Sequence, residues 1–236
     1  MTKPLISALK NLCCPAGESG GAPRQRRKEA RPGELLAAAL TLFVERGYSA
    51  TRLDDVAAQA GVTKGTLYLY YDNKEALFKA VLAQNLVPII DEGRRYIEQH
   101  QGSQADLLKG LMLTWWQEVG ATAAGGIFKL IISESGNFPD AAAYYYEAVI
   151  VPAREMIGGV IQRGIDQGEF RPVDVETTFH VIFAPLLMLS LWRNSFAICG
   201  QGIDPEQYLT TSVEMTLNGL RQEGMAVYFT TPNPTI

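Results

Sequence analysis

The sequence of 236 residues predicts an all-α fold. Apolar residues recur at spacings of three and four along nearly the whole chain, which is the period of an amphipathic helix. Alternating runs of Val, Ile and Thr bounded by hairpin turns, which would indicate strands, are almost absent. With 47% hydrophobic and 19% charged residues, the chain has enough apolar material for a real core, in one large domain or two small ones.

The first predicted helix begins at Pro32, because proline is favoured at the first helical position, and ends before Gly47, a typical residue just past a helix end. The second helix runs from residue 51 or 52 to Ala60. Thr51 and Asp54 have the spacing of a capping box, with Asp in place of the usual Glu. These boundaries leave a short connection between the two helices.

A third, short helix is capped by Thr63 and extends through Tyr71. Asp72 or Asn73 caps a long fourth helix that continues towards His100. Further helical segments are expected over residues 104–121, 126–136, 140–167, 174–197 and 205–222, and residues 223–236 form a C-terminal tail. The later part of the chain is therefore predicted to be helical throughout.

The turn after Ala60 brings the second and third helices together. Small residues at Ala57 and Gly61 allow the two helices to cross closely, as a helix-turn-helix requires. We therefore predict a helix-turn-helix over about residues 52–71. The helix after such a turn is the one that enters the DNA major groove.

The third helix can be oriented at 100° per residue, with the inward direction set midway between residues 67 and 71. Leu69 then points outward, Gly65 and Thr66 share its surface, and Tyr68 and Tyr70 lie on opposite flanks. An outward leucine suits the methyl group of thymine, and two phenol hydroxyls could reach phosphates on either side of the groove. Taken singly, each of these side chains could equally be ordinary surface.

Charge is unevenly distributed along the chain. Residues 1–82 hold 12 Lys and Arg against 8 Asp and Glu, whereas residues 83–236 hold 9 against 17. A basic N-terminal third joined to an acidic remainder is typical of a nucleic-acid-binding head on a separate sensing body, although uneven surface charge alone would give the same split. Residues 1–28 end in a Gly/Pro/Ser-rich stretch and a basic cluster, which predicts a flexible basic arm that either contacts DNA or is a solvated tail.

Composition argues against catalysis and metal binding. Cys13, Cys14 and Cys199 are an odd number without metal-ligand spacing, and His100 and His180 are the only histidines. A zinc site or a histidine-based triad is therefore difficult to build, and we predict no enzyme activity, no metal and no cofactor. Sparse cysteines fit a reducing compartment, so the expected location is cytoplasmic.

Neither a signal peptide nor a membrane span is expected. Pro4 and Lys10 interrupt the apolar residues of the N-terminus. The most apolar stretch, Phe179–Trp192, covers 14 residues. As a helix it would rise about 21 Å, short of the roughly 30 Å hydrocarbon core. A buried or dimer-facing helix is the expected role, with no membrane partner.

Residues 29–88 closely resemble the DNA-binding domain of the TetR/AcrR family of bacterial transcriptional regulators. The matching segments are LLAAALTLFVERGYSATRLDDVA and AGVTKGTLYLYYDNKEALF, including the Gly-Thr-Leu-Tyr-x-Tyr core and the Asn-Lys-Glu that opens the fourth helix. The resemblance covers a quarter of the chain. It implies a homodimeric repressor that binds a palindromic double-stranded DNA operator and is released by a small molecule.

The resemblance also implies roles for residues in the head. It places Lys64, Gly65, Thr66, Tyr68 and Leu69 near the bases, and Thr51, Arg52, Thr63, Tyr70 and Lys74 near the phosphates. One departure is Asp54, which stands where many relatives carry an arginine that reaches a base. Base contacts from the second helix are therefore in doubt.

The head is predicted to span residues 29–89, and a ligand-binding and dimerisation domain to span residues 90–222. By resemblance, segments 174–197 and 205–222 pack against their copies in the partner as a four-helix bundle. Pro88 lies inside the fourth helix, where the missing N–H and the ring are expected to cause a kink. We expect this kink to act as a hinge between effector and DNA.

Aromatic and apolar residues of the second domain predict a cavity for a small hydrophobic or aromatic effector. Each of them could instead be an ordinary core residue. The candidate ligand-binding residues are Trp115, Trp116, Phe128, Ile131, Glu134, Tyr145, Phe179, His180, Phe183 and Trp192.

Three alternative functions remain open on this sequence. The chain could be a transcriptional activator or a ligand-independent regulator of the same family. More remotely, it could be a helical interaction module that uses the helix-turn-helix only for packing and does not bind DNA. Salt-dependent retention on DNA separates the last from the others, because phosphate contacts give a steep salt dependence.

Overall fold

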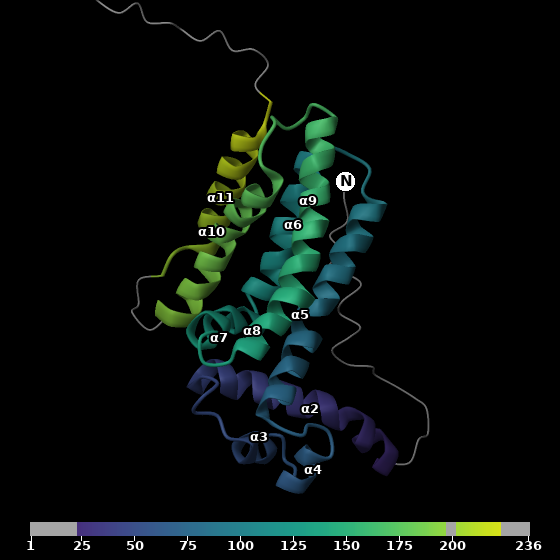
Figure 1. Cartoon of the computed structure of the whole chain (residues 1–236), viewed down its shortest axis with the longest axis vertical. Coiled ribbons are helices and arrows are strands. Elements are labelled where there is room, and N and C mark those ends of the chain that lie inside the picture. The colour runs from purple at the N-terminus through teal and green to yellow at the C-terminus, as the bar shows by residue number, and fades with distance from the viewer. Residues whose placement is uncertain (1–22, 197–201, 223–236) are drawn as a thin grey trace, which may run out of the picture.

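The computed structural model describes residues 23–196 and 202–222, and within these ranges the elements are helical apart from one isolated bridge between Phe170 and Arg221. The all-α prediction is confirmed. Figure 1 shows an elongated molecule with a small head formed by α2, α3 and α4, and a larger body formed by the later helices. The long helix α5 belongs to both parts.

Helix α2 spans Pro23–Arg46 and so begins earlier than predicted, with Pro32 inside it. The prediction was wrong because the residues before Pro32 are mostly Arg, Gln, Lys, Glu and Ala, which favour helix strongly enough to extend it. Residues 23–28, assigned to a flexible arm, are therefore helical. The rest of that arm, with Cys13 and Cys14, lies outside the described residues, as do Cys199 and the tail 223–236.

The helix-turn-helix consists of α3 (Leu53–Gln59) and α4 (Lys64–Tyr68). Gly47 and Gly61 have φ angles of 85° and 66°, a left-handed conformation that glycine adopts without strain. As the sequence predicted, Gly47 directly follows α2 and Gly61 lies in the turn after α3. Helix α4 is shorter than expected, since it ends at Tyr68 and Leu69 is already its C-cap.

Helix α5 spans Lys74–Gln99 and is continuous on both sides of Pro88. Asn73 caps it, with its side-chain oxygen accepting a hydrogen bond of 2.8 Å from the N–H of Ala76. Seven of the elements that follow belong to the body. They are α6 (Gln104–Trp115), the π-helical turn η1 (Trp116–Gly120), the 3₁₀ turn η2 (Ala123–Gly125), α7 (Gly126–Glu134), α8 (Pro139–Tyr145), the π-helical turn η3 (Tyr146–Ile150) and α9 (Val151–Asp166).

The predicted segment 140–167 is thus one helical run interrupted by a π-helical turn. Pro152, the second residue of α9, has no N–H to donate to the preceding turn, which accounts for the change of hydrogen-bond register before it. A second π-helical turn follows α6. A π-helical turn contains more residues than an α-helical turn, so side chains after it point in other directions than a regular α-helix would give them.

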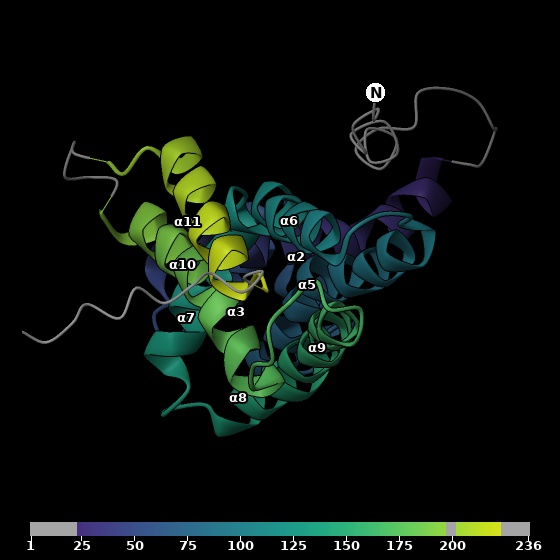
Figure 2. The ribbon, with the colours of Figure 1, turned by 90° about the horizontal axis from the view of Figure 1, so that it is seen from above.

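Helices α10 (Val175–Phe196) and α11 (Pro205–Leu220) lie side by side along one edge of the body in both views (Figures 1 and 2). The expectation that the apolar stretch is too short to span a membrane was wrong. As a helix of 22 residues, α10 is long and apolar enough by length and composition, alone among the described residues. It nevertheless packs on α7, α9 and α11 through the buried side chains of Phe179, Ile182, Leu186 and Leu189.

Two hydrophobic cores hold the molecule together. The first lies in the head and extends to α5, α7 and α8; its centre includes Phe43, Leu67, Leu77 and Leu82. The second lies in the body between α6, α9, α10 and α11. Because α5 contributes to the first core and α7 and α8 pack on the head, the head is attached to the body by more than one helix.

Candidate DNA-binding surface and ligand cavity

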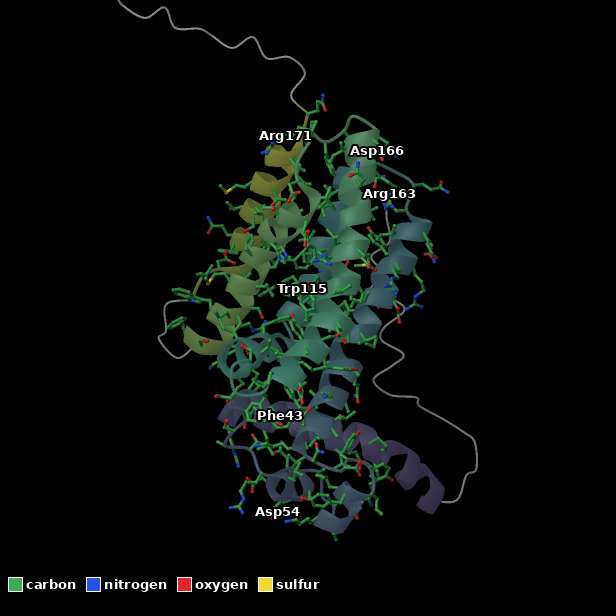
Figure 3. All side chains as sticks on the ribbon, in the orientation of Figure 1. Phe43, Asp54, Trp115, Arg163, Asp166 and Arg171 are labelled. Carbon is green, nitrogen blue, oxygen red and sulfur yellow. The ribbon has the colours of Figure 1, made fainter. Side chains whose placement is uncertain are left out.

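The helix-turn-helix lies at the end of the molecule furthest from α9 and α11, where Figure 3 labels Asp54. Val56 and Ala57 of α3 and Leu67 of α4 are buried and fix the crossing of the two helices. The hydroxyl oxygen of Thr63 accepts a hydrogen bond from the N–H of Thr66, so Thr63 caps α4 as predicted. The packing leaves the opposite face of α4 in solvent.

Leu69 and Tyr68 are the prominent apolar side chains of this face, with 82% and 43% of their surface exposed. A Cβ added to Gly65 would meet only the Thr63 hydroxyl oxygen, at 3.9 Å. The protein interior therefore does not require glycine at position 65. An open position beside an exposed leucine is what close approach to another molecule requires.

Lys64 is paired with Asp54 across the turn. Its ammonium nitrogen lies 2.8 Å and 3.1 Å from the two carboxylate oxygens of Asp54. The hydrogen bond to Asp54 and the charge of that carboxylate raise the pKa of Lys64. Asp54 therefore adds no positive charge at this position, and its carboxylate competes with DNA phosphates for the Lys64 ammonium.

Two of the residues predicted to contact phosphates also hold the loop before α3. Thr51 is only 1% exposed, and its hydroxyl donates to the carbonyl oxygens of Leu42 (3.1 Å) and Gly47 (2.7 Å). Because this hydroxyl is used in the turn, it does not cap α3, whose N-cap position is occupied by Arg52 without a side-chain cap. The capping box expected at Thr51 and Asp54 is therefore absent.

Lys74 holds the loop before α3. Its ammonium donates to the carbonyl oxygens of Tyr48 (2.8 Å), Ser49 (3.2 Å) and Thr51 (3.0 Å), and its nitrogen lies 4.5 Å from the centre of the Tyr48 ring. An ammonium group has three N–H donors, and all three are used. Partial burial lowers the pKa of Lys74. Lys74 therefore positions the loop before α3 in the structure.

The remaining residues predicted to contact DNA differ in their exposure to solvent. Arg52, Thr63 and Lys64 are exposed, whereas Thr66 is half-buried and its hydroxyl lies 2.9 Å from that of Thr63. Tyr70 is half-buried and packs against the first core, on the turn after α4. The structure therefore places Arg52, Thr63, Lys64, Gly65, Thr66, Tyr68 and Leu69 together on one end of the head.

The body contains a cavity of about 130 Å³ between α5, α6, α9 and α10, closed by residues of α7 and α8. Trp115, which lines it, is labelled near the middle of the body in Figure 3. Six of the ten predicted ligand-binding residues line this cavity: Trp115, Phe128, Tyr145, Phe179, His180 and Phe183. Their rings contact one another, with the Trp115 centroid 5.4 Å from that of Phe128 and 5.8 Å from that of Phe183.

Four predicted residues lie elsewhere. Trp116 is buried in the second core, whereas its neighbour Trp115 lines the cavity. Ile131 and Glu134 line a small gap between α7 and the head. Trp192 lies against Phe196 near the end of α10, with ring centroids 4.8 Å apart. Helical periodicity alone could not distinguish these positions from those that face the cavity.

Several polar residues of the cavity were not predicted. Glu92 and Tyr96 line it from α5, and Thr114 and Glu118 line it from the end of α6 and the turn η1. A glutamate on an amphipathic helix normally faces solvent, so the sequence gives no signal for Glu92. Glu118 reaches the cavity from within a π-helical turn, which no periodicity of 3.6 residues anticipates.

The head and body meet at the loop held by Lys74. The Ser49 hydroxyl donates to the Glu134 carboxylate at 3.2 Å, and the Tyr48 and Phe138 rings have centroids 4.3 Å apart. Burial, followed by the nearby Glu75 and Glu134 charges, raises the pKa of Tyr48 to about 12. Helix α7 therefore has Phe128 in the cavity wall and, at its other end, Glu134 on the head.

The edge formed by α10 and α11 has an apolar surface. Val181, Met188 and Met215 have between 50% and 71% of their surface exposed. A groove between the two helices is lined by residues that include Val181, Pro185, Tyr208 and Met215. Large exposed apolar side chains concentrated on one edge are typical of an interaction surface.

Fold and site together define a DNA-binding transcriptional regulator of two parts, with a helix-turn-helix head on a helical body. Comparison with known proteins identifies the family. Residues 35–81 match the family described as "Bacterial regulatory proteins, tetR family", and residues 99–196 match "Tetracyclin repressor-like, C-terminal domain". The chain is 30% identical over 175 residues to the HTH-type transcriptional repressor KstR2 of Rhodococcus jostii, covering 71% of this chain and 79% of that protein. It belongs to the TetR family of transcriptional regulators, which are not enzymes.

Solved structures show the same fold at lower identity. The fatty acid degradation regulator FadR of Bacillus halodurans is 21% identical with a TM-score of 0.69, covering 80% of this chain and 99% of that one. FadR of Bacillus subtilis in complex with stearoyl-CoA is 18% identical with a TM-score of 0.60, again covering 80% and 99%. These likenesses concern the fold alone.

Proposed function

We propose that this protein is a homodimeric repressor that binds a palindromic operator and is released when a small apolar effector enters the cavity of the body. The observation that carries the proposal is the position of α5. This helix begins directly after the helix-turn-helix and lines the cavity with Leu86, Ile89, Ile90, Glu92, Gly93 and Tyr96. A ligand that changes the cavity therefore acts on the helix that holds the head.

The proposed DNA contacts come from the exposed end of the head. Leu69 and Gly65 face the bases, Tyr68 and Thr63 reach the flanking phosphates, and Arg52 contributes a cation at the start of α3. The exposure of Leu69 and the open space at Gly65 support this arrangement. The positively polarised start of α4 adds to the attraction for phosphate.

The proposed dimer uses the edge formed by α10 and α11. Its exposed apolar side chains and the groove between the helices would be covered by the same surface of a second chain, giving a symmetric interface. Such a dimer presents two heads to successive major grooves about 34 Å apart on one face of the duplex. A cytoplasmic location follows from access to the chromosome.

The effector is proposed to act through two routes to the head. The cavity residues of α5 lie on both sides of Pro88, where one backbone hydrogen bond is missing and bending is easier. The second route is α7, which joins Phe128 in the cavity wall to Glu134 on the Ser49 loop. A cavity of about 130 Å³ is smaller than the usual 300–1,000 Å³ of ligand sites, so binding must move these walls.

The operator can be obtained by selecting bound sequences from a random pool of double-stranded DNA. The expected result is a sequence with two-fold symmetry, bound by two chains, with affinity that falls steeply as salt rises. A protein that remains a monomer, or that selects no sequence, would contradict the proposal. A reporter gene placed behind the selected site then separates repression from activation.

The role of the cavity can be tested with Ala153→Phe, which places a ring in the cavity from α9. This variant should keep its affinity for the operator and lose the response to effectors. Pro88→Ala should keep both operator and ligand affinities and weaken the coupling between them. If Pro88→Ala releases DNA as the unchanged protein does, the hinge at Pro88 is not the route.

A further inference from the structure

The charge of the cavity lining points to the chemical class of the effector. Among the described residues that line it are two glutamates, Glu92 and Glu118, and no lysine or arginine. Both glutamates are half-buried. Within residues 23–196 and 202–222 neither carboxylate has a hydrogen bond or an ion pair to another side chain.

A third polar group faces the same space. Tyr145 is only 9% exposed and lines the cavity. Burial raises the pKa of Tyr145, so the phenol stays neutral. A neutral phenol in the cavity wall can donate a hydrogen bond to a ligand or accept one from it.

The rest of the wall is aromatic. Trp115, Phe128, Phe179 and Phe183 surround the cavity, and the faces of such rings carry negative potential that attracts cations. The two carboxylates and the ring faces therefore all contribute negative potential to the cavity. His180 is exposed, and it is the only basic side chain among the lining residues that the structure describes.

We propose that the cavity selects a compact apolar cation, a protonated amine or quaternary ammonium on an aromatic or alicyclic skeleton, and discriminates against carboxylates and acyl-CoA thioesters. This inference rests on the proposed function, in which the cavity is the effector site. A ligand that fills the cavity displaces the water that solvates both glutamates. A cation replaces that water with opposite charge, a neutral ligand leaves the carboxylates unpaired, and an anion adds repulsion.

The test uses three probes that share one skeleton and differ in charge: naphthylmethyl-trimethylammonium, naphthylmethanol and naphthylacetate. Their binding to the full-length protein is measured by isothermal titration calorimetry. The expected order of affinity is cation, then alcohol, then anion, with at least about a tenfold step between cation and alcohol. The cation should also lower the affinity for the selected operator.

Variants locate the origin of the selectivity. Glu92→Gln and Glu118→Gln keep the side-chain shape and should reduce the preference for the cation by about tenfold each. Glu98→Gln on α5 and Glu147→Gln in η3 remove the same charge from exposed positions outside the cavity and should leave the preference unchanged. Ala153→Phe should abolish the binding of all three probes.

The outcomes separate the inference from the function on which it rests. Equal or tighter binding of naphthylacetate, abolished by Ala153→Phe, would overturn the charge selection and leave the cavity as the effector site. Probe binding that survives Ala153→Phe, or no binding of any probe, would remove the cavity from both proposals. A loss of cation preference in the two control variants as large as in Glu92→Gln would show that net charge alone is responsible.

Discussion

Truncation of Leu69 tests the proposed DNA surface with little effect on the fold. Its side chain is 82% exposed at the end of α4, so Leu69→Ala should change the free energy of unfolding by less than about 0.5 kcal/mol. Leu67, two residues earlier and within α4, is fully buried. The matched change Leu67→Ala should cost about 2–5 kcal/mol, because it leaves a cavity in the first core.

The expected effect on DNA follows from the area that Leu69 can bury. Leu→Ala removes three carbon atoms, and each buried CH₂ contributes about 0.8 kcal/mol, so full burial against a thymine methyl is limited to about 2 kcal/mol per half-site. This loss should be confined to one base pair in each half of the operator. Substituting that base pair should weaken the unchanged protein and have little effect on the variant.

Competition fluorescence anisotropy at fixed salt measures this effect, with the selected operator and a set of single-base substitutions. Ile132→Ala provides a control, since Ile132 is 63% exposed on α7 and lies outside the proposed surface. An unchanged pattern of base preference in Leu69→Ala would refute the assignment. So would an equal loss of affinity on every sequence, which indicates contact with the backbone of the duplex.

Four further predictions concern the head. Asp54→Asn should raise the affinity for all DNA sequences, because it frees Lys64 to contact a phosphate. The slope of log affinity against log salt should become steeper by about 0.9 per half-site. An unchanged slope would show that the Lys64–Asp54 pair already opens when the unchanged protein binds DNA. Thr51→Val should lower the free energy of unfolding by about 1–3 kcal/mol, measured by urea unfolding. Lys74→Met should loosen the loop before α3 and so weaken DNA binding. Faster amide hydrogen exchange in that loop would report the loosening. Burial raises the pKa of Tyr48 to about 12. The unfolded chain therefore loses the phenolic proton before the folded chain does, and the free energy of unfolding should fall as pH rises from about 10 towards 12. Tyr48→Phe should show a shallower decline in that window, and identical slopes would mean that Tyr48 ionises freely.

Local signals in the sequence were reliable where a residue acts on its immediate neighbours. The caps at Thr63 and Asn73 and the left-handed glycines at Gly47 and Gly61 all lie where they were expected. Each depends on hydrogen bonds or φ angles within a few residues. The exposure of Leu69 likewise followed from counting 100° per residue along one short helix.

The sequence by itself determined the helical class, the helix-turn-helix and six of the residues that line the cavity, because periodicity and capping depend on nearby residues. The tertiary structure decided which polar groups are used internally. Thr51 and Lys74 are held by carbonyl groups, and Lys74 reaches back more than twenty residues to those of the loop before α3. It also placed Glu92 and Glu118 in one cavity, from different elements. Their shared environment depends on how helices pack and on a π-helical turn, and neither is encoded in the spacing of residues along one helix.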